Sequence, residues 1–313
     1  MPDTKRKGSL YFQTSWMLYL MLLLPLAFFT VFCYVPIPNI IIAFKDYNLF
    51  RGAWDSPWAK LDSGELNIFK WFIAAFTSKE FYNALKNTMI LNLLDLLVGF
   101  PAPIILAILL NELPFWRYKK FTQTVVYLPH FLSWIIISGI AVQLFAPASG
   151  VVNMFLGRLG FAPINFLMEK HLWVGTYIGL GVWREMGWGT IIYLAAISGI
   201  SPEIYEAAEV DGAGRFRKIW HVTLPGLRPT VAVLLIMNLG RILGSGFDRP
   251  YVMSNSLVLD VSDVIATYVY RVGIRASQFS LTTAVGLFQS VVCVLFLIAA
   301  NTLAEKAGER GVW

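Results

Sequence analysis

The sequence predicts an all-α integral membrane protein with six transmembrane helices, and three observations support this fold class. Of the 313 residues, 57% are hydrophobic and only 14% are charged, whereas a soluble domain carries about a quarter charged residues. The mean hydropathy is +0.62. Six apolar windows also follow one another along the chain, each of about 20 residues, which is the length that a helix needs to cross a bilayer.

The six spans are predicted at residues 16–36, 85–110, 121–145, 172–198, 230–249 and 281–303. The first span follows a basic tail, as a cleaved signal peptide does. Its apolar run is too long for a signal peptide, however, and no small-residue cleavage site follows it. The first span is therefore predicted to remain as a membrane helix, and residues 1–313 are predicted to form a single transmembrane domain.

Lysine and arginine near the spans predict the orientation of the chain. The basic residues of one side lie in both tails and two loops: Lys5, Arg6, Lys7, Arg117, Lys119, Lys120, Arg215, Arg217, Lys218, Arg228, Lys306 and Arg310. The two shorter loops of the other side carry only Arg158, Lys170, Arg271 and Arg275. The excess of positive charge predicts that both termini and the loop at 199–228 are cytoplasmic. The net charge of +6 therefore needs no nucleic-acid partner, and no nucleic-acid motif is visible.

The long outward loop at 37–83 is rich in aromatic residues, including Trp54, Trp58 and Trp71. Because amphipathic aromatic rings favour the membrane interface, this extracytoplasmic loop is predicted to lie near the outer leaflet as short helical pieces. A small independent domain is the alternative.

The cysteines and histidines predict no metal site and no disulfide. Cys33 and Cys293 both lie within apolar runs, and two thiols cannot complete a zinc site. The three histidines, His130, His171 and His221, are isolated from one another in the sequence.

The loop at 199–228 is polar although it lies between two apolar spans. Ser201 and Pro202 are typical of a helix start, and Glu203, Glu206 and Glu209 would make one face of that helix acidic. The glycines of Asp211-Gly212-Ala213-Gly214 then break the helix, and a basic segment leads back to the membrane. The expected structure is a short helix, a sharp turn and a second helix. A solvated interfacial helix without a partner is the alternative.

The spacing within this loop is specific. Glu206-Ala207-Ala208, three residues, Gly212, nine residues, Val222, one residue and Leu224-Pro225 resemble the cytoplasmic loop motif of permease subunits in ATP-binding-cassette (ABC) importers. Val222 stands where isoleucine is commoner. Residues 34–52, 99–112, 127–134 and 182–197 look like the oligosaccharide or polysaccharide importer permeases, so that the resemblance covers nearly the whole chain.

The resemblance implies a type I importer fold and a set of partners. The loop would be the coupling helix that seats in a cleft of the ATPase subunit, and Glu206 would form an ion pair with an ATPase arginine. The implied coupling residues are Glu206, Ala207, Ala208, Asp211, Gly212, Ala213 and Gly214. A second, similar permease, two ATPase subunits, an extracytoplasmic sugar-binding protein, an oligosaccharide and membrane lipid are the implied partners.

The chain itself is not expected to be an enzyme. It contains no GxxxxGK[ST] pattern, so ATP and Mg²⁺ are expected on the separate ATPase polypeptides, with no cofactor in this chain. No HExxH or GxSxG pattern is present either.

Ionisable residues inside predicted spans indicate a sugar path, because such groups usually face a protein interior or a water-filled cavity. The residues predicted to border it are Arg184, Glu185, Trp188, Arg241, Ser245 and Asp248. The alternative is that Arg184 or Arg241 pairs with Glu185 or Asp248 only to hold helices together. Asn92, Asp95 and Asn111 are expected to join or cap helices.

The sequence thus predicts a multi-pass permease in a bacterial inner membrane that forms half of the path of an ATP-driven oligosaccharide importer. Arg184 and Arg241 would tolerate an acidic, uronate-containing sugar, such as one derived from alginate or pectin; the alternative is that both are paired and neutral in effect. The rival function is an ion-coupled secondary sugar carrier with Asp95 and Glu185 on the ion path. That function leaves the motif at Glu206 unexplained.

Overall fold

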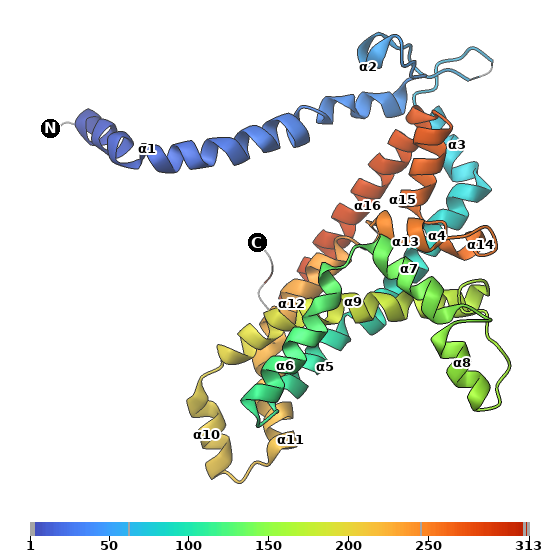
Figure 1. Ribbon diagram of the computed structural model, residues 1–313. Helices are drawn as coiled ribbons and strands as arrows, with labels where there is room; N and C mark the ends of the chain where they lie inside the picture. The colour runs from blue at the N-terminus through green and yellow to red at the C-terminus, as the bar shows by residue number, and fades with distance from the viewer. Residues whose placement is uncertain (1–3, 62, 245, 309–310, 312–313) are drawn as a thin grey trace. The chain divides into compact units, whose positions relative to one another are not determined.

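The computed structural model describes residues 4–308, apart from 62 and 245, and residue 311 (Figure 1). Every element assigned within these residues is helical, apart from two isolated β-bridges, Lys45 with Trp58 and Lys60 with Leu66. The predicted all-α fold class is confirmed. The described chain packs as two compact units. The single-domain assignment stays a prediction.

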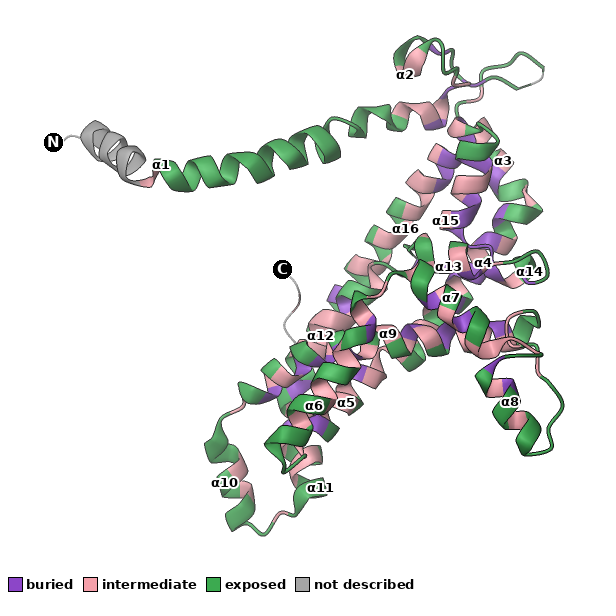
Figure 2. Ribbon diagram, viewed as in Figure 1, coloured by how far each residue is buried: buried purple, intermediate pink, exposed green. Residues whose placement is uncertain are grey.

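Unit 1 contains the residues up to Ala75 together with Gln278–Leu287. Its elements are α1 (Thr4–Phe29), a π-helical turn (Thr30–Tyr34), a 3₁₀-helix (Ile37–Phe44), α2 (Gly52–Asp55) and the beginning of α3 (Lys70–Thr77). The short helical pieces expected at 37–83 are present. From Trp16 to its end, α1 is exposed (Figure 2), with Leu24 at 74%. A helix that is apolar on all sides is typical of a membrane span.

A buried lysine organises the loop of unit 1. The Lys45 ammonium donates to the carbonyls of Ala53 at 3.0 Å and Trp54 at 2.5 Å. The carbonyl of Lys45 accepts from the Trp71 indole at 2.9 Å and the Ser280 hydroxyl at 2.7 Å. These hydrogen bonds satisfy the polar groups that burial removes from water. The side-chain ammonium and the backbone carbonyl of Lys45 together hold the loop in place.

Unit 2 contains Phe76–Ser277 and the residues from Phe288 onward. Its helices are α4 (Lys79–Leu94), α5 (Pro101–Asn111), α6 (Trp116–Tyr127), α7 (Trp134–Phe145), α8 (Val151–Arg158), α9 (Lys170–Ser198), α10 (Pro202–Val210), α11 (Arg215–Lys218), α12 (Leu224–Leu239), α13 (Asp248–Met253), α14 (Leu259–Ser262), α15 (Ile265–Tyr268) and most of α16 (Phe279–Lys306). The long helix α9 packs against α5, α6 and α12. Its two ends bury Trp173 and Tyr193 in separate apolar clusters.

Four segments among the described residues are long and apolar enough to span a membrane: Ser15–Phe44, Lys79–Asn111, Arg215–Leu239 and Phe279–Lys306. A fifth candidate, Trp116–Phe131 with Trp134–Phe145, is bent by 104°. The helix α9 is about 43 Å long, sufficient to cross a bilayer, but it carries Arg184 and Glu185 in its middle. The count of six spans and the cytoplasmic location of both termini stay predictions.

Two predicted spans differ in form from the structure. The third, at 121–145, is interrupted because Pro129 lies in a 3₁₀ turn and Ser133 caps a new helix by accepting from the Ile136 amide at 3.3 Å. The fifth, at 230–249, ends as a helix at Leu239. Gly240 and Gly244 follow within a series of tight turns, where glycine is tolerated better than in a helix. Both segments are predominantly apolar, so their composition did not reveal these interruptions of the helix.

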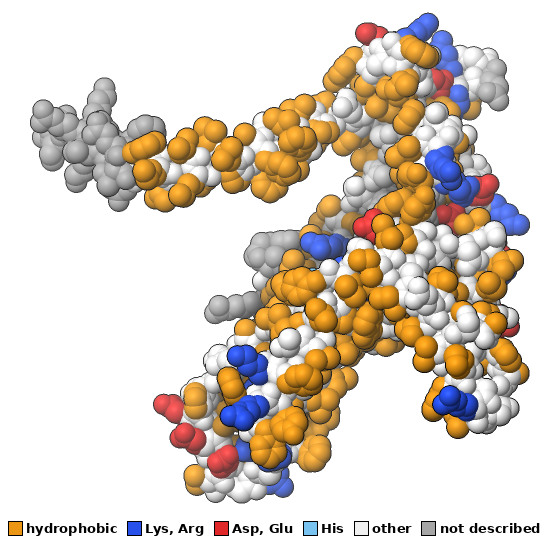
Figure 3. Space-filling view, in the orientation of Figure 1, with side chains coloured by type: hydrophobic (Ala, Val, Ile, Leu, Met, Phe, Trp, Pro, Cys, Tyr) orange, Lys and Arg blue, Asp and Glu red, His pale blue; other side chains and the backbone are white. Residues whose placement is uncertain are grey.

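The polar loops of unit 2 lie at opposite ends of it. In Figure 1, α10 and α11 form a hairpin at one end, whereas α8 and α14 lie toward the other end. Charged side chains of both signs gather on the hairpin, and hydrophobic side chains dominate the helices that lead away from it (Figure 3). A membrane-spanning bundle requires this separation of charged loops from hydrophobic helix surfaces.

Candidate functional site

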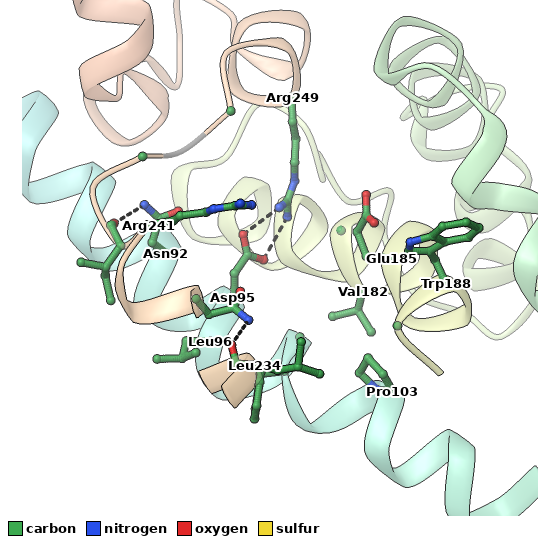
Figure 4. Close-up of a pocket in the computed structure, with 18 of the residues that line it drawn as sticks. Asn92, Asp95, Leu96, Pro103, Val182, Glu185, Trp188, Leu234, Arg241 and Arg249 are labelled. Carbon is green, nitrogen blue, oxygen red and sulfur yellow. Dashed lines mark hydrogen bonds and ion pairs between the residues drawn. The ribbon is translucent and has the colours of Figure 1, made fainter. Parts of the chain in front are cut away.

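A cavity of about 460 Å³ lies within unit 2, bordered by α4, α5, α9, α12 and the turns that follow α12 (Figure 4). Its wall contains four charged side chains, Asp95, Glu185, Arg241 and Arg249. Asp95 begins a π-helical turn, Asp95–Gly99, between α4 and α5. Pro101 lacks the amide proton that would continue an α-helix at this point, so the helix widens where the carboxylate enters the cavity.

Asp95 and Arg249 form a two-pronged ion pair across the cavity wall. One guanidinium nitrogen donates to Asp95 Oδ2 at 2.7 Å and the other donates to Oδ1 at 3.3 Å. The second nitrogen also donates to the Tyr177 carbonyl at 2.5 Å. Two parallel hydrogen bonds set the relative orientation of the two side chains and also bring opposite charges together. The pair therefore joins the end of α4 to α9 and α13.

Aromatic rings enclose the Arg249 guanidinium. Its central carbon lies 3.7 Å from the centre of the Tyr177 ring and 5.1 Å from that of Trp134. A side chain at Gly181 would collide with the guanidinium, so only glycine leaves room for it here. The charge is thus held by an anion, a carbonyl and two π faces.

Glu185 belongs to a second polar cluster on the opposite side of the cavity. It forms an ion pair with Arg184 and a hydrogen bond with His130, whose Nδ1 lies 3.0 Å from Glu185 Oε2. The His130 ring stacks on Trp188, with 4.6 Å between ring centres and 5° between planes. Trp188 is nevertheless 46% exposed. An exposed ring edge and a hydrogen-bonded carboxylate are suited to a polar ligand with apolar patches.

Arg241 is exposed on the cavity wall. Among the described residues it is the one charged lining residue with no ion-pair partner, since Asp95 pairs with Arg249 and Glu185 with Arg184 and His130. Nearby, the Asn92 side chain donates to the Ile242 carbonyl at 2.5 Å and thereby ties the turn after α12 to α4.

The structure brings together three of the six residues predicted to border a sugar path: Glu185, Trp188 and Arg241 line the cavity. Arg184 does not, because its guanidinium donates to the Leu132 carbonyl at 3.1 Å and to Glu185. Asp248 does not line it either and begins α13 as an exposed residue. Ser245 lies outside the described residues.

The sequence did not predict the positions of two residues at or beside the cavity. Asp95 was expected to join helices; it does so through Arg249, but it also lines the cavity. His130 is isolated from other ionisable candidates in the sequence, but the 3₁₀ turn Leu128–Phe131 places it beside Glu185. The signal for Asp95 was present, since an acid in an apolar span needs a cation nearby. No sequence signal identified Arg249 as the partner of Asp95.

The loop at 199–228 has the predicted form of two helices joined by a sharp turn. The first helix, α10, ends in a Schellman motif, in which the Ala213 amide donates to the Ala208 carbonyl at 2.8 Å and the Gly212 amide donates to the Glu209 carbonyl at 3.0 Å. Gly212 has a φ of +73°, which side-chain-bearing residues rarely adopt. Ser201 stands at the predicted N-cap, but its side chain makes no capping hydrogen bond.

Two contacts close the hairpin formed by residues 202–223. The Tyr205 hydroxyl lies 3.0 Å from the hydroxyl of Thr223, a buried residue in the π-helical turn Ile219–Thr223. Lys218 donates to Glu209 at 2.6 Å, and this hydrogen bond together with the lysine charge lowers the pKa of Glu209. Because the pKa is lowered on folding, this contact stabilises the hairpin above pH ~4.3 and is lost as the pH falls through the lowered value.

The hairpin exposes both charge and apolar surface. Glu206 and Ala207 are exposed, and so are the large apolar side chains of Val210 at 89% and Phe216 at 82%. Exposed apolar residues beside fixed charges are typical of a protein docking surface. The residues predicted for coupling thus lie together on one hairpin, and their role stays a prediction.

Comparisons with known proteins agree with these features. Residues 71–307 match the family described as binding-protein-dependent transport system inner membrane component. The permease protein YteP of a polygalacturonan/rhamnogalacturonan transport system in Bacillus subtilis (strain 168) is 43% identical over 296 residues, covering 95% of this chain and 90% of that protein. Protein LplB of the same organism is 44% identical, with coverages of 95% and 91%.

Solved structures agree as well. A chain of a bacterial ABC transporter involved in the import of the acidic polysaccharide alginate is 38% identical, with a TM-score of 0.84 and coverages of 94% of this chain and 97% of that one. A structure of bacterial alginate ABC transporter in complex with an alginate pentasaccharide-bound periplasmic protein gives a TM-score of 0.85, with coverages of 96% and 98%. These matches confirm the predicted resemblance to permeases and the assignment to transport instead of enzyme catalysis. The chain belongs to the family of binding-protein-dependent transport system inner membrane components.

Proposed function

We propose that this chain forms half of the translocation path of an ATP-driven importer for a carboxylate-bearing oligosaccharide in a bacterial inner membrane. A second, similar permease supplies the other half. Two ATPase subunits bind ATP and Mg²⁺ and dock on the hairpin, and an extracytoplasmic binding protein delivers the sugar. The relatives support this function, because the names of the matched proteins include polygalacturonan transport and import of the acidic polysaccharide alginate.

The observation that carries the proposal is the Arg241 guanidinium on the cavity wall, which has no ion-pair partner among the described residues. The acids that line the cavity are already paired, Asp95 with Arg249 and Glu185 with Arg184 and His130. A carboxylate on a passing sugar can therefore bind Arg241 without displacing an existing pair. A guanidinium is suited to this task because it binds a carboxylate through two parallel hydrogen bonds.

Trp188 complements Arg241 on another part of the wall. Its ring is half-exposed and is held by stacking on His130. Sugar rings have apolar faces that pack on aromatic rings, and a fixed ring loses little entropy on binding. One wall residue would thus bind the charge of the sugar and another its ring face.

The helix α12 connects the hairpin to this cavity. It starts after the π-helical turn that holds Thr223 and ends at Leu239, two residues before Arg241. Asn238, within the last turn of α12, also lines the cavity. Closure of the ATPases would push the hairpin, tilt α12 and move the cavity wall. Nucleotide and sugar would then each bias the same two-state rearrangement.

The test is transport by the complete importer in proteoliposomes loaded with ATP. Arg241→Gln is expected to reduce uptake of a uronate oligosaccharide by about tenfold or more, since a hydrogen bond to a charged group contributes about 1.5–3 kcal/mol. Uptake of a neutral oligosaccharide of equal length through the same path should not fall. Arg241→Lys should restore part of the acidic-sugar uptake, because the charge returns without the forked geometry.

Arg158→Gln is the matched control, since it removes one exposed arginine at the end of α8, outside both the cavity wall and the loop at 199–228. Equal loss of acidic and neutral sugar uptake in Arg241→Gln would contradict the proposed carboxylate contact. Uptake that persists without ATP and follows an ion gradient would contradict the importer and support the secondary carrier.

A further inference from the structure

A second cavity, of about 700 Å³, lies in unit 2 and is lined by none of the hairpin residues. It is bordered by the first turns of α4, the start of α9 and α14. The sugar path proposed above does not use it. Its wall is polar at one end and apolar at the other, and its chemistry differs from that of the first cavity.

Two lysines of this second cavity have no ion-pair or hydrogen-bond partner among the described residues. Lys79 and Lys86 are both exposed and line the cavity from α4. The other charges of the wall are paired: Lys170 with Asp260, and Glu80 with Arg271 of the π-helical turn Val269–Arg275. Among the described residues, the cavity wall therefore presents two unpaired positive charges and no unpaired negative charge.

The wall opposite these lysines is fixed by hydrogen bonds. The side chains of Asn83 and Asn87 both donate to the Asp260 carbonyl, at 3.0 and 2.8 Å, and Asn87 also donates to the Asp263 carbonyl at 3.0 Å. Arg271 joins Glu80 at 2.9 Å to Asp263 at 2.8 Å. The segment carrying α14 is thus held on α4, and the cavity exists without a ligand to form it.

The polarity of the cavity changes along α4. Lys79, Tyr82 and Lys86 lie in its first two turns, whereas Ile90 and Leu91 line the cavity one to two turns further on, where Val174 of α9 also contributes. The span Lys79–Asn111 has 33 residues and is about 50 Å long, which exceeds the hydrocarbon core of ~30 Å. Its polar first turns therefore reach the headgroup layer, and the apolar end of the cavity lies at the level of the acyl chains.

We propose that this second cavity binds an anionic glycerophospholipid. Its phosphate contacts the ammonium groups of Lys79 and Lys86, and one acyl chain packs along Ile90 and Val174. The two unpaired cations select negative charge. The apolar end favours a lipid over a free phosphate or an acidic protein surface, because neither of these covers apolar side chains. The exposed Tyr82, at 67%, suits the same interface.

The test uses the complete importer in nanodiscs and native mass spectrometry with phosphatidylglycerol or phosphatidylcholine. Wild type is expected to retain phosphatidylglycerol in preference to phosphatidylcholine. The double variant Lys79→Gln/Lys86→Gln should lower that retention by about tenfold or more. Lys60→Gln/Lys306→Gln removes the same charge at two other exposed lysines and should change nothing. Inorganic phosphate should not displace the lipid.

A second variant separates the tail from the headgroup. Ile90→Gln leaves both lysines in place and is expected to weaken retention of phosphatidylglycerol, because it removes apolar contact. Equal retention by wild type and Lys79→Gln/Lys86→Gln would overturn the proposal. So would displacement by inorganic phosphate, or lower affinity for the sugar-binding protein with lipid retention unchanged. The last result would assign the cavity to protein docking.

Discussion

At the scale of single residues, Arg249 shows how a cation is accommodated inside an apolar bundle. Only 13% of its side chain is exposed, and isolated burial of a charge is expensive. Asp95 supplies the opposite charge, the Tyr177 carbonyl accepts a hydrogen bond, and the Tyr177 ring lies against the guanidinium. Arg249 thereby links three helices. Removal of its partner Asp95 should therefore lower the stability of the protein as well as transport.

We predict that Asp95→Asn destabilises the permease by about 2–4 kcal/mol, because it leaves a buried guanidinium without its counter-charge. Thermal unfolding of the purified importer in detergent should shift down by about 5 °C or more. Asp248→Asn is the matched control, since Asp248 is exposed and forms no ion pair among the described residues. Equal unfolding temperatures for Asp95→Asn and wild type would contradict a stabilising role of the pair.

At the scale of elements, the two arms of the hairpin of residues 202–223 are joined by side-chain contacts. Gly212 closes the end of α10, and Tyr205 and Lys218 join the two arms. Thr223, the partner of Tyr205, is 1% exposed and immediately precedes α12. A push on α10 therefore reaches α12 through a side-chain contact as well as through the chain.

We predict that Tyr205→Phe lowers the number of sugars transported per ATP hydrolysed. The variant loses the hydroxyl contact with Thr223, worth about 1 kcal/mol, while the ring remains, so hydrolysis should continue and uptake should fall by about two- to tenfold. The measurement is uptake and phosphate release in the same proteoliposomes. Tyr118→Phe, at an exposed tyrosine of α6, is the control. An unchanged ratio of uptake to phosphate release in Tyr205→Phe would show that the contact with Thr223 does not contribute to coupling.

At the scale of the whole molecule, the hairpin and the cavity are connected by α12 within unit 2, although the hairpin lies at one end of that unit (Figure 1). If a separate ATPase docks on the hairpin, as proposed, its energy reaches a cavity that the ATPase does not touch. The coupling free energy must pass through Glu206 and its neighbours if the hairpin is the docking surface.

We predict that Glu206→Lys abolishes ATP-driven uptake, because it places a positive charge where an ATPase arginine is expected to bind. The sugar affinity of the binding protein should be unchanged, since that site lies on another polypeptide. Uptake, co-purification with the ATPase and sugar binding are measured together. Full uptake by Glu206→Lys would rule out the coupling role, and Glu206→Asp should retain part of the activity.

The sequence determined the class of this protein: its helical fold, its membrane character and the hairpin of residues 202–223. Apolar length and the local chemistry of Pro202 and Gly212 act over a few residues, so they can be read without a fold. Helix breaks inside apolar segments were missed, because the composition around Pro129 and Gly240 still resembles a continuous span.

Only the tertiary structure decided which ionisable residues face the cavity. Arg184 and Arg241 have similar positions within predicted spans, yet Arg184 pairs with Glu185 and Arg241 has no ion-pair partner among the described residues. Asp95 and Arg249 meet although 154 positions separate them. Periodicity assigns a residue to a span, but the rotation of each helix and the contacts between distant segments arise from packing the whole bundle. For that reason the sequence determined the family and the hairpin, and the packing determined the composition of the cavity wall.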